Sequence, residues 1–525
     1  MFSFKKGDLQ KIRSRFLHPL QLMILAVLML LAVVYPQRLL AALAAVDSYV
    51  AEWAIAFGGR DAGEAASIGV DSASNVYTAG YFQNAFDFGG GDNNPVGLGQ
   101  RDIFIAKTDK DGGFVWAKAI GSSNIDEAKS MAVDGNGDAY VTGRFRGTAD
   151  FDPNAGVVNR SSVGDDDIFV MKLDANGALV WANTFGGITT DEGYGIGIGV
   201  NSVVATGFFS GTTDFDPANV GSADVLTSTA ASRDIFVANY NSADGAFKWV
   251  NYVAGIGFND RGDAADIDAA GNVYVTGYFG NADTNFNPKG TPAIPNHGSN
   301  RDVFVVKYDP NGAFQWVYAA GGTGSDVGNA IVVDDADNVY ITGSFENTVD
   351  FDPDPDGAAE LISAGSDDIF LVALKSNGAF NWAKRIGGVG SDQATGLALD
   401  DKGRLHVAGS FSSNVDFDPG DGVTTLTSLG ATDAFAIILS IDGDLEAAGQ
   451  MGGVGSEVGR SIAVDDSGIY VAGSFDGVGD YDPSREEAAL TPVGSTDIFV
   501  VKLQQQAITG SAVGKALYLP VIERN

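Results

Sequence analysis

The chain has 525 residues, of which 70 are glycine and 15 are proline, with 45% apolar and 19% charged residues. A glycine share of about twice the usual 7%, without the proline content of disordered chains, is typical of a folded, turn-rich protein. We therefore expect an all-β fold. The 67 acidic residues exceed the 32 basic ones by 35 charges, which argues against nucleic acid as a partner. The absence of cysteine and the three histidines exclude disulfides and make a Ser/His/Asp triad hard to assemble.

The first 44 residues have the layout of an export signal. Five basic residues precede an apolar run at 22–34, and small residues follow, ending at Ala44 and Ala45. A run of about 13 residues is shorter than the ~20 that span a bilayer, which favours cleavage over anchoring. We predict a signal peptide or signal anchor at 1–44 and an extracytoplasmic location, secreted or at the cell surface. An uncleaved segment at 20–35 would be the only tie to a membrane.

The chain repeats one unit of about 65 residues seven times between residues 45 and 503. The tripeptide Asp-Ile-Phe, or a close variant, begins at Asp102, Asp167, Asp234, Asp302, Asp368, Asp433 and Asp497. All six tryptophans fall at one repeat position: Trp53, Trp116, Trp181, Trp249, Trp316 and Trp382. Seven regular copies predict one closed array of repeats, followed by a C-terminal tail at 504–525 of unassigned role.

Each unit contains four short β-type runs, separated by glycine- and aspartate-rich turns. In one unit they are Ala330–Val333, Val339–Phe345, Ile369–Ala373 and Phe380–Arg385. Four antiparallel strands per unit make a propeller blade, so we predict a seven-bladed β-propeller. The last unit lacks a Trp-type strand and the chain begins with one, around Trp53. We expect this N-terminal strand to complete the last blade and close the ring.

These units resemble the SBBP β-propeller repeat family of bacterial exported proteins. The resemblance is carried by Gly-Ser-Asp-Val-Gly-Asn-Ala-Ile-Val-Val-Asp at Gly324–Asp334 and Asn-Val-Tyr-Ile-Thr-Gly-Ser-Phe at Asn338–Phe345. It implies the fold and little about function. The segment Asp174–Trp181 looks like the tryptophan-docking motif of quinoprotein propellers, but it is one residue shorter and lacks the threonine, so no quinone cofactor is inferred.

By analogy with other propellers, the first strand of each blade lines the axis and the Trp strand is outermost. Two sets of acidic loop residues then share one face. The first set is Asp126, Asp191, Asp260, Asp326, Asp392 and Glu457, with Asp61 before the first blade. The second is an Asp-Phe-Asp-Pro series, in which the last copy has tyrosine in place of phenylalanine.

The acidic members of that series are Asp150, Asp152, Asp214, Asp216, Asp350, Asp352, Asp416, Asp418, Asp480 and Asp482. Paired carboxylates at i and i+2 are ligands that calcium prefers. Alternatively, each aspartate folds its own turn through side-chain-to-backbone hydrogen bonds, with the aromatic residue as a plug. The fourth unit has Asn285 and Asn287 at these positions, which favours the turn interpretation. Calcium is the one possible cofactor, and we predict no catalytic residue.

Other repeated residues are expected to be structural. The tryptophans suit packing between blades, and the aspartate that opens each Asp-Ile-Phe strand suits a repeated hydrogen bond. His406 takes the place of a tyrosine and suits ordinary packing.

These observations predict an exported, non-enzymatic propeller that acts as a binding or scaffolding module for protein or glycan partners on its loop face. One alternative is an extracellular polysaccharide hydrolase or lyase that uses loop carboxylates. Another is a structural surface-layer component. The sequence does not define the oligomeric state.

Overall fold

The computed structural model describes residues 48–506, apart from 217–223, 229–231, 254, 256–258, 281–283, 288–299, 355–356 and 485–487. The described residues lie in one compact unit. The predicted export signal at 1–44 and residues 507–525 of the tail lie outside them. Nearly all regular structure in the described residues is β-strand, and the short 3-10 helix η1 (Gly91–Asn93) is the only helix there. None of these residues forms a helix long and apolar enough to cross a membrane.

The strands pair in antiparallel sets of four, one set for each repeat. The first sets are β2 (Gly63–Val70), β3 (Val76–Phe82), β5 (Asp102–Thr108), β6 (Phe114–Ile120); β7 (Glu127–Val133), β8 (Ala139–Asp150), β9 (Asn159–Leu173), β10 (Leu179–Phe185); and β11 (Glu192–Gly199), β12 (Ser202–Phe209), β15 (Asp234–Tyr240), β16 (Phe247–Val253). Next come β17 (Arg261–Ile267), β18 (Val273–Phe279), β19 (Asp302–Tyr308), β20 (Phe314–Gly322); and β21 (Val327–Val333), β22 (Val339–Asp350), β23 (Glu360–Leu374), β24 (Phe380–Gly388). The last are β25 (Gln393–Leu399), β26 (Leu405–Phe411), β29 (Asp433–Leu439), β30 (Leu445–Gly453); and β31 (Val458–Asp465), β32 (Gly468–Phe475), β35 (Asp497–Gln506), β1 (Ser48–Gly59).

Short strands extend some loops between the second and third strands of a set. They are β4 (Phe86–Asp87), β13 (Thr212–Asp214), β14 (Val225–Thr227), β27 (Asn414–Asp416), β28 (Thr425–Thr427), β33 (Gly479–Asp480) and β34 (Ala489–Leu490).

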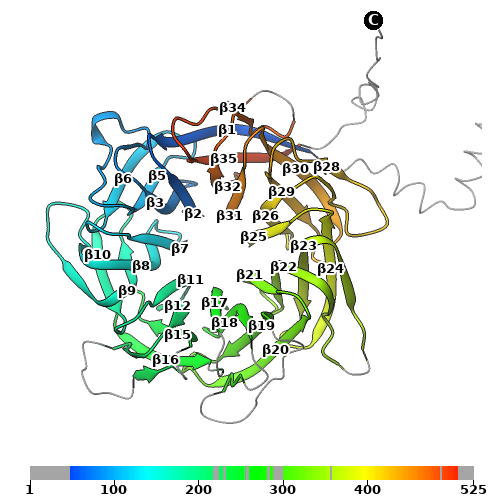
Figure 1. The fold of residues 1–525 in the computed structure, drawn as a ribbon, viewed down its shortest axis with the longest axis horizontal. Coiled ribbons are helices and arrows are strands. Elements are labelled where there is room, and N and C mark those ends of the chain that lie inside the picture. Colours follow the sequence, from blue (N-terminus) through cyan, green and yellow to red (C-terminus); the bar gives the residue numbers. More distant parts are fainter. Residues whose placement is uncertain are drawn as a thin grey trace, which may run out of the picture. The chain divides into compact units, whose positions relative to one another are not determined.

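The sets are arranged around a central opening, and the first strand of each set lies nearest to it (Figure 1). The tryptophan-bearing strands β6, β10, β16, β20 and β24 lie outermost, as the sequence predicts. The first strand β2 contacts β7 of the next set and also β31 of the last set.

The N-terminal strand β1 pairs antiparallel with β35, which lies more than 400 residues away in sequence. The register runs from Ser48 opposite Gln506 to Phe57 opposite Ile498. β1 therefore takes the fourth place after β31, β32 and β35. The lone strand around Trp53 and the three-stranded last unit are complementary, as the sequence analysis expected.

The second and third strands of each set are largely buried on both faces where they pair with each other. All seven residues of β3 and of β5 are buried, and the same holds for β18 and β19. Residues such as Phe104 and Ile105 point to opposite faces, because side chains alternate along a strand. They pack against the neighbouring sheet on each side, which explains the continuous apolar runs in the sequence.

The tryptophans pack between neighbouring sets, as predicted. The Trp116 indole donates a hydrogen bond to the carbonyl oxygen of Ala175 in the next set, at 3.2 Å. Trp53 does the same to Lys110 in the first set, at 3.0 Å. Gly112 lies under the Trp53 ring with φ of +82°, and a Cβ there would come within 3.1 Å of the ring. A tryptophan and a turn glycine thus join each of these pairs of sets.

Candidate functional site

The Asp-Phe-Asp-Pro loops are turns held by their own aspartates. Asp150 Oδ1 accepts hydrogen bonds from the backbone N–H groups of Asp152 at 3.1 Å and Val158 at 2.8 Å. Asp152 Oδ1 accepts one from Asn154 at 2.9 Å. The aromatic residue between them, Phe151, is fully buried. These are the side-chain-to-backbone hydrogen bonds that the turn interpretation predicts.

The other copies repeat this geometry. Asp214, Asp350, Asp416 and Asp480 each accept a bond from the backbone two residues ahead, at 3.0–3.2 Å. In the fourth unit Asn285 accepts the equivalent bond from Asn287 at 3.0 Å without any charge. Within the described ranges, no three histidine or acidic side chains gather as a metal-binding group. Calcium at these loops stays a prediction.

In the first acidic set, a buried carboxylate accepts backbone hydrogen bonds from two neighbouring sheets, and we call this arrangement a bracket. Asp126 accepts hydrogen bonds from the backbone N–H of Ser122 at 2.6 Å and of Arg146 at 2.9 Å. Asp191, Asp326 and Asp392 do the same in their own units. Burial raises the pKa of Asp126 to about 6 and those of Asp191 and Asp326 to about 7.

Each bracket lies beside the aspartate that opens an Asp-Ile-Phe strand. A Cβ on Gly121 would come within 2.1 Å of Asp102 Oδ1 and 3.2 Å of Asp126 Oδ2. Two carboxylates therefore converge on a glycine, and the negative charge of Asp102 adds to the rise in the pKa of Asp126. Both acidic sets are recognisable in the sequence, but their spacing does not predict that they meet.

The first blade lacks this bracket. Gly63, rather than Asp61, occupies the equivalent position, because its N–H bonds to Thr496 O just as that of Asp126 bonds to Arg101 O. The Phe86 ring fills the space where a carboxylate would lie. Asp61 instead accepts a bond from the side chain of Asn84 at 2.8 Å near the surface. Counting Asp61 with the acidic set was wrong, since it lies two residues before the equivalent position.

The inner strands share a feature that the sequence analysis missed. Each has a β-bulge directly after a small residue, at Ala65, Ala128, Gly193, Gly262, Gly328, Ala394 and Gly459. A bulge re-aims a side chain, and bulges are frequent beside functional sites. The bulged residues are Ala66, Lys129, Tyr194, Asp263, Asn329, Thr395 and Arg460. No two of them are alike, although the residues directly before and after them in the seven strands are all alanine, glycine or serine.

The seven bulged residues line one cavity at the centre of the ring, which we call the axial pocket. Its volume is about 290 Å³, and Glu64, Ala65, Tyr81 and Ala128 complete its lining. The non-repeating position is the signal by which the sequence alone could have revealed this site. Aligning the units and asking which position varies would have selected it.

Two hydrogen-bonded groups stiffen the axial pocket. The side-chain amide of Asn329 donates to Ala394 O at 2.8 Å, and the Thr395 hydroxyl donates to Gly459 O at 2.7 Å. Each bond reaches the neighbouring inner strand. Opposite them, the Tyr194 hydroxyl donates to Glu192 at 2.9 Å.

Two carboxyl groups in or beside the pocket have shifted pKa values. Burial alone would raise the pKa of Glu127, but Lys129, Arg144 and Arg101 outweigh it and hold this pKa at about 2. Burial raises the pKa of Asp263 to about 6, and the nearby Arg261 opposes this rise. Asp263 Oδ2 is buried without a hydrogen-bond partner. A firmly ionised acid, Glu127, thus lies beside Lys129 of the pocket, and an acid with a raised pKa, Asp263, belongs to its lining.

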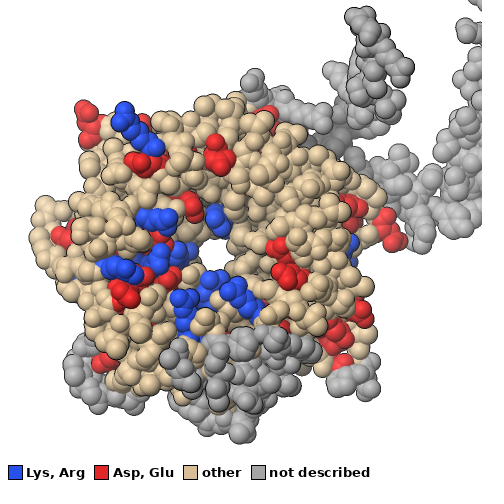
Figure 2. Space-filling model, in the orientation of Figure 1, with Lys and Arg blue, Asp and Glu red and all other residues tan. Residues whose placement is uncertain are grey.

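Basic side chains surround the pocket on one side, although the protein as a whole is acidic. Figure 2 shows lysine and arginine side chains gathered around part of the central opening. We call this set the basic crescent: Lys129, Arg261 and Arg460 on inner strands, Arg144 and Arg146 on the second strand β8, and Arg101, Arg233 and Arg301 directly before third strands. Arg144 forms ion pairs with Glu127 at 2.9 Å, Asp166 at 3.2 Å and Glu192 at 3.0 Å.

Three arginines of the crescent lie over aromatic rings at the end of a second strand. The pairs are Arg101 on Tyr81, Arg233 on Phe208 and Arg301 on Tyr278, at 4.3, 4.1 and 4.3 Å from the ring centres. The other side of the opening has small polar or acidic residues at the equivalent positions: Ser344 and Asp367, Ser410 and Thr432, Ser474 and Thr496. The face is therefore asymmetric in charge and in side-chain size.

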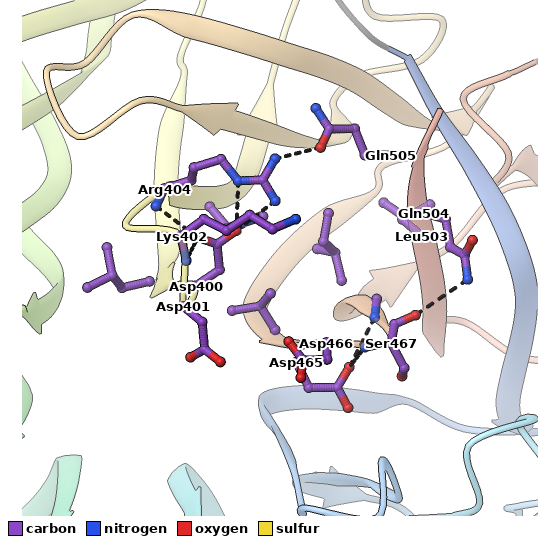
Figure 3. Close-up of a pocket in the computed structure, with 15 residues that line it drawn as sticks. Asp400, Asp401, Lys402, Arg404, Asp465, Asp466, Ser467, Leu503, Gln504 and Gln505 are labelled. Atoms are coloured by element: carbon purple, nitrogen blue, oxygen red, sulfur yellow. Dashed lines mark hydrogen bonds and ion pairs between the residues drawn. The ribbon is translucent and has the colours of Figure 1, made fainter. Parts of the chain in front are cut away.

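A second cavity lies among the hairpin turns that follow the first strands, between the sixth and last sets (Figure 3). Its volume is about 320 Å³. Asp400 accepts hydrogen bonds there from Arg404 Nε at 2.7 Å and pairs with His406 Nε2 at 3.0 Å. His406 is fully buried, and burial lowers its pKa. The network is consistent with the predicted packing role of His406.

Comparisons with known proteins agree with a repeat protein of the propeller type. Residues 115–144 match the family model described as SBBP, beta-propeller repeat. The chain is 25% identical over 510 residues to the uncharacterized WD repeat-containing protein L264 of Acanthamoeba polyphaga mimivirus, with 81% of this chain and 36% of that protein covered. It is 22% identical to the regulatory protein FlaEY of Caulobacter vibrioides, with 78% and 42% covered. The chain thus spans less than half the length of these relatives.

Solved structures with similar strand arrangements include the WD40 repeats of RRP9. That likeness has a TM-score of 0.45 and 10% identity, and covers 88% of this chain and 100% of that one. The quinohemoprotein alcohol dehydrogenase of Comamonas testosteroni has a TM-score of 0.35 and 9% identity, with 88% and 77% covered. The strand pairing and the matched repeat together define an all-β, antiparallel protein of β-propeller repeats.

Proposed function

We propose that this chain is a closed seven-bladed β-propeller that binds a protein partner at its axial pocket, and that it is exported and non-catalytic. Closure is supported by the pairing of β1 with β35. It is also supported by the contact of β2 with both β7 and β31, and by the bond from Trp53 to Lys110. A ring closed in this way leaves only short, protected sheet edges and offers a rigid face for binding.

The observation that carries the binding function is the variation of the bulged residues. Structural positions repeat from unit to unit, as Trp316 and Trp249 do, because each unit packs against its neighbours in the same way. The bulge position changes in every unit, from alanine to lysine, tyrosine, aspartate, asparagine, threonine and arginine. Such variation at a position that lines the axial pocket fits recognition of one asymmetric partner.

A protein partner fits this face better than a small-molecule substrate. The pocket is small, at about 290 Å³, and its surroundings are broad and polar, which suits one inserted side chain with contacts around it. The similarity to a WD repeat-containing protein is in keeping with a binding or scaffolding role.

Photo-crosslinking tests the proposal. A photoreactive amino acid replaces Ala66, a half-buried residue that lines the pocket, and a matched variant carries it at Val115, an exposed residue of the outer strand β6. Irradiation in the cells that express the chain should give a discrete protein adduct at residue 66 and none at residue 115. Equal adducts at both positions would contradict an axial binding site.

The rival function is an extracellular polysaccharide hydrolase or lyase. It would use Asp263, whose pKa of about 6 suits a general acid, together with Glu64 in the same pocket. Incubation of the purified protein with acidic and neutral polysaccharides distinguishes the two. Release of reducing ends that Asp263→Asn abolishes would favour the enzyme.

A further inference from the structure

Two arginines of the basic crescent have guanidinium groups that the protein leaves available. Arg301 is exposed and Arg233 is half-buried, and neither forms an ion pair with a carboxylate of the described residues. By contrast, Arg144 forms ion pairs with three carboxylates. The rings of Tyr278 and Phe208 lie against these two guanidinium groups, so less conformational entropy is lost when the groups bind a ligand. Burial raises the pKa of the nearby Asp263, and the charge of Arg301 opposes this rise without a close ion pair between them.

Arg301 also lines a hollow with other hydrogen-bonding groups. The hollow has a volume of about 350 Å³ and is lined by Asn259, Gly280, Asn300, Arg301 and Ser325. A guanidinium group with amide and hydroxyl groups beside it matches the planar, bidentate shape of a carboxylate. The Asn300 amide is oriented by a bond to Thr323 O at 3.1 Å.

The charge of the protein and the covered aromatic rings indicate which kind of ligand fits these two arginines. Nucleic acid would meet the overall charge of −35 beyond the crescent and be repelled. A glycan would be expected to stack on a free aromatic face, but guanidinium groups cover Tyr278 and Phe208. Side-chain carboxylates spaced along a peptide need only the guanidinium groups.

We propose that the basic crescent binds an acidic peptide segment of the protein partner, with carboxylates of that segment on Arg301 and Arg233. This inference rests on the proposed function, because it names the chemistry of the partner at the axial face. The acidic segment would lie along the basic side of the opening, away from Asp367 on the other side. The excess of acidic residues elsewhere on the protein would then disfavour binding of the same segment outside the crescent.

Fluorescence anisotropy with a labelled peptide of ten glutamates tests this inference. The full chain should bind this probe at low ionic strength, and the dissociation constant should rise steeply as salt is added. The double variant Arg233→Glu/Arg301→Glu should weaken binding by at least about tenfold, since charge-assisted hydrogen bonds are lost and repulsion is added. The neutral variants Arg233→Gln and Arg301→Gln cover the case in which charge reversal unfolds the protein, and each should weaken binding severalfold.

The matched control is Lys110→Glu/Lys402→Glu. It changes the net charge equally, but Lys110 and Lys402 lie in exposed hairpin turns outside the crescent. If the control weakens binding as much as the crescent variant, general electrostatics accounts for it and the inference fails. Equal binding of a trigalacturonate or an oligodeoxythymidine probe would also overturn it. If the glutamate probe does not bind while crosslinking at residue 66 still gives a protein adduct, the inference fails and the proposed function stands.

Discussion

The Arg261 guanidinium lies 4.2 Å from the centre of the Tyr194 ring, and the two residues come from the inner strands β17 and β11 of neighbouring sets. Tyr194 is a bulged residue, and Arg261 pairs with the bulged Asp263 at 2.6 Å. One contact therefore couples two non-repeating positions of the axial pocket. The pocket is a connected group of side chains rather than seven separate ones.

The glycines between the paired carboxylates should be intolerant of a side chain. Gly121→Ala places a Cβ 2.1 Å from Asp102 Oδ1, which forces the buried carboxylate out of its hydrogen bonds. We expect a loss of about 1–3 kcal/mol in the free energy of unfolding, as for other overpacked sites. Urea denaturation measures it.

Gly135→Ala is the control for this test. Its Cβ would meet only Ser72 Cβ at 3.9 Å, and its φ is ordinary. Its effect should lie within about 0.5 kcal/mol. Similar losses in both variants would show that the carboxylates do not converge on Gly121.

The buried brackets should make the protein more stable in mild acid than in mild base. The pKa values of Asp126, Asp191 and Asp326 are raised to about 6 or 7 when folded, against about 3.9 in an unfolded chain. The folded state therefore binds more protons, so the stabilisation is complete below pH 4 and is lost as the pH rises through 6 to 7. Glu127, with its lowered pKa of about 2, acts in the opposite sense, and its contribution is lost only below about pH 4.

Thermal unfolding from pH 4.5 to 8 tests this dependence. The melting temperature should fall across the range, and each titrating carboxyl contributes a slope of about 1.4 kcal/mol per pH unit between its two pKa values. Asp191→Asn should remove one such contribution. A melting temperature that rises with pH over this range would contradict the prediction.

The Asp-Phe-Asp-Pro turns should need a hydrogen-bond acceptor rather than a charge. Asn285 already plays this part in the fourth unit, so Asp150→Asn should change stability by less than about 0.5 kcal/mol. Asp150→Ala removes the acceptor for two backbone N–H groups and should cost about 1–3 kcal/mol.

Both variants should be unfolded with millimolar calcium and with chelator. A calcium-dependent rise in melting temperature that Asp150→Asn diminishes would establish the loops as metal sites. The turn interpretation requires the same result in calcium and in chelator.

The sequence was most informative where the units repeat. Alternating strands and turn residues predicted the four strands per unit, and the lone strand around Trp53 predicted the pairing seen with β35. It was least informative about bulges, because a bulge is a mismatch between two strands and no single strand records it. Lys129 in β7 has nothing in its own strand that marks it as a bulge, and its role emerged only from the register of β7 against β8.

The error over Asp61 has a related cause. Spacing from neighbouring motifs placed it with the acidic set, but the hydrogen bond from Gly63 to Thr496 fixes the true register. Likewise, the convergence of Asp102 and Asp126 on Gly121 depends on how two loops fold back on each other. Linear spacing does not contain that information.

Closure of the ring by β1 can be tested by removing the strand. Deletion of residues 46–58 leaves β35 as an unpaired edge and removes the contact that Trp53 makes with Lys110 of the first set. We expect a large fall in melting temperature. Glu52→Ala is the control, because it removes an ion pair with Lys502 at 2.9 Å and a hydrogen bond from Gln504 at 2.9 Å but leaves the strand in place, so its effect should be much smaller than that of the deletion. An unchanged melting temperature in the deletion would contradict closure.

The most direct test of the account compares the axial pocket with the repeated acidic loops. The axial variant is Lys129→Ala/Tyr194→Ala/Arg460→Ala, and the loop variant is Asp152→Asn/Asp352→Asn/Asp418→Asn. Each carries the photoreactive residue at position 66, and the yield of the partner adduct is quantified by mass spectrometry after both proteins are shown to be folded. If the partner binds at the axial pocket, the axial variant loses the adduct and the loop variant keeps it. Loss in the loop variant with retention in the axial variant would place the function on the acidic loops instead.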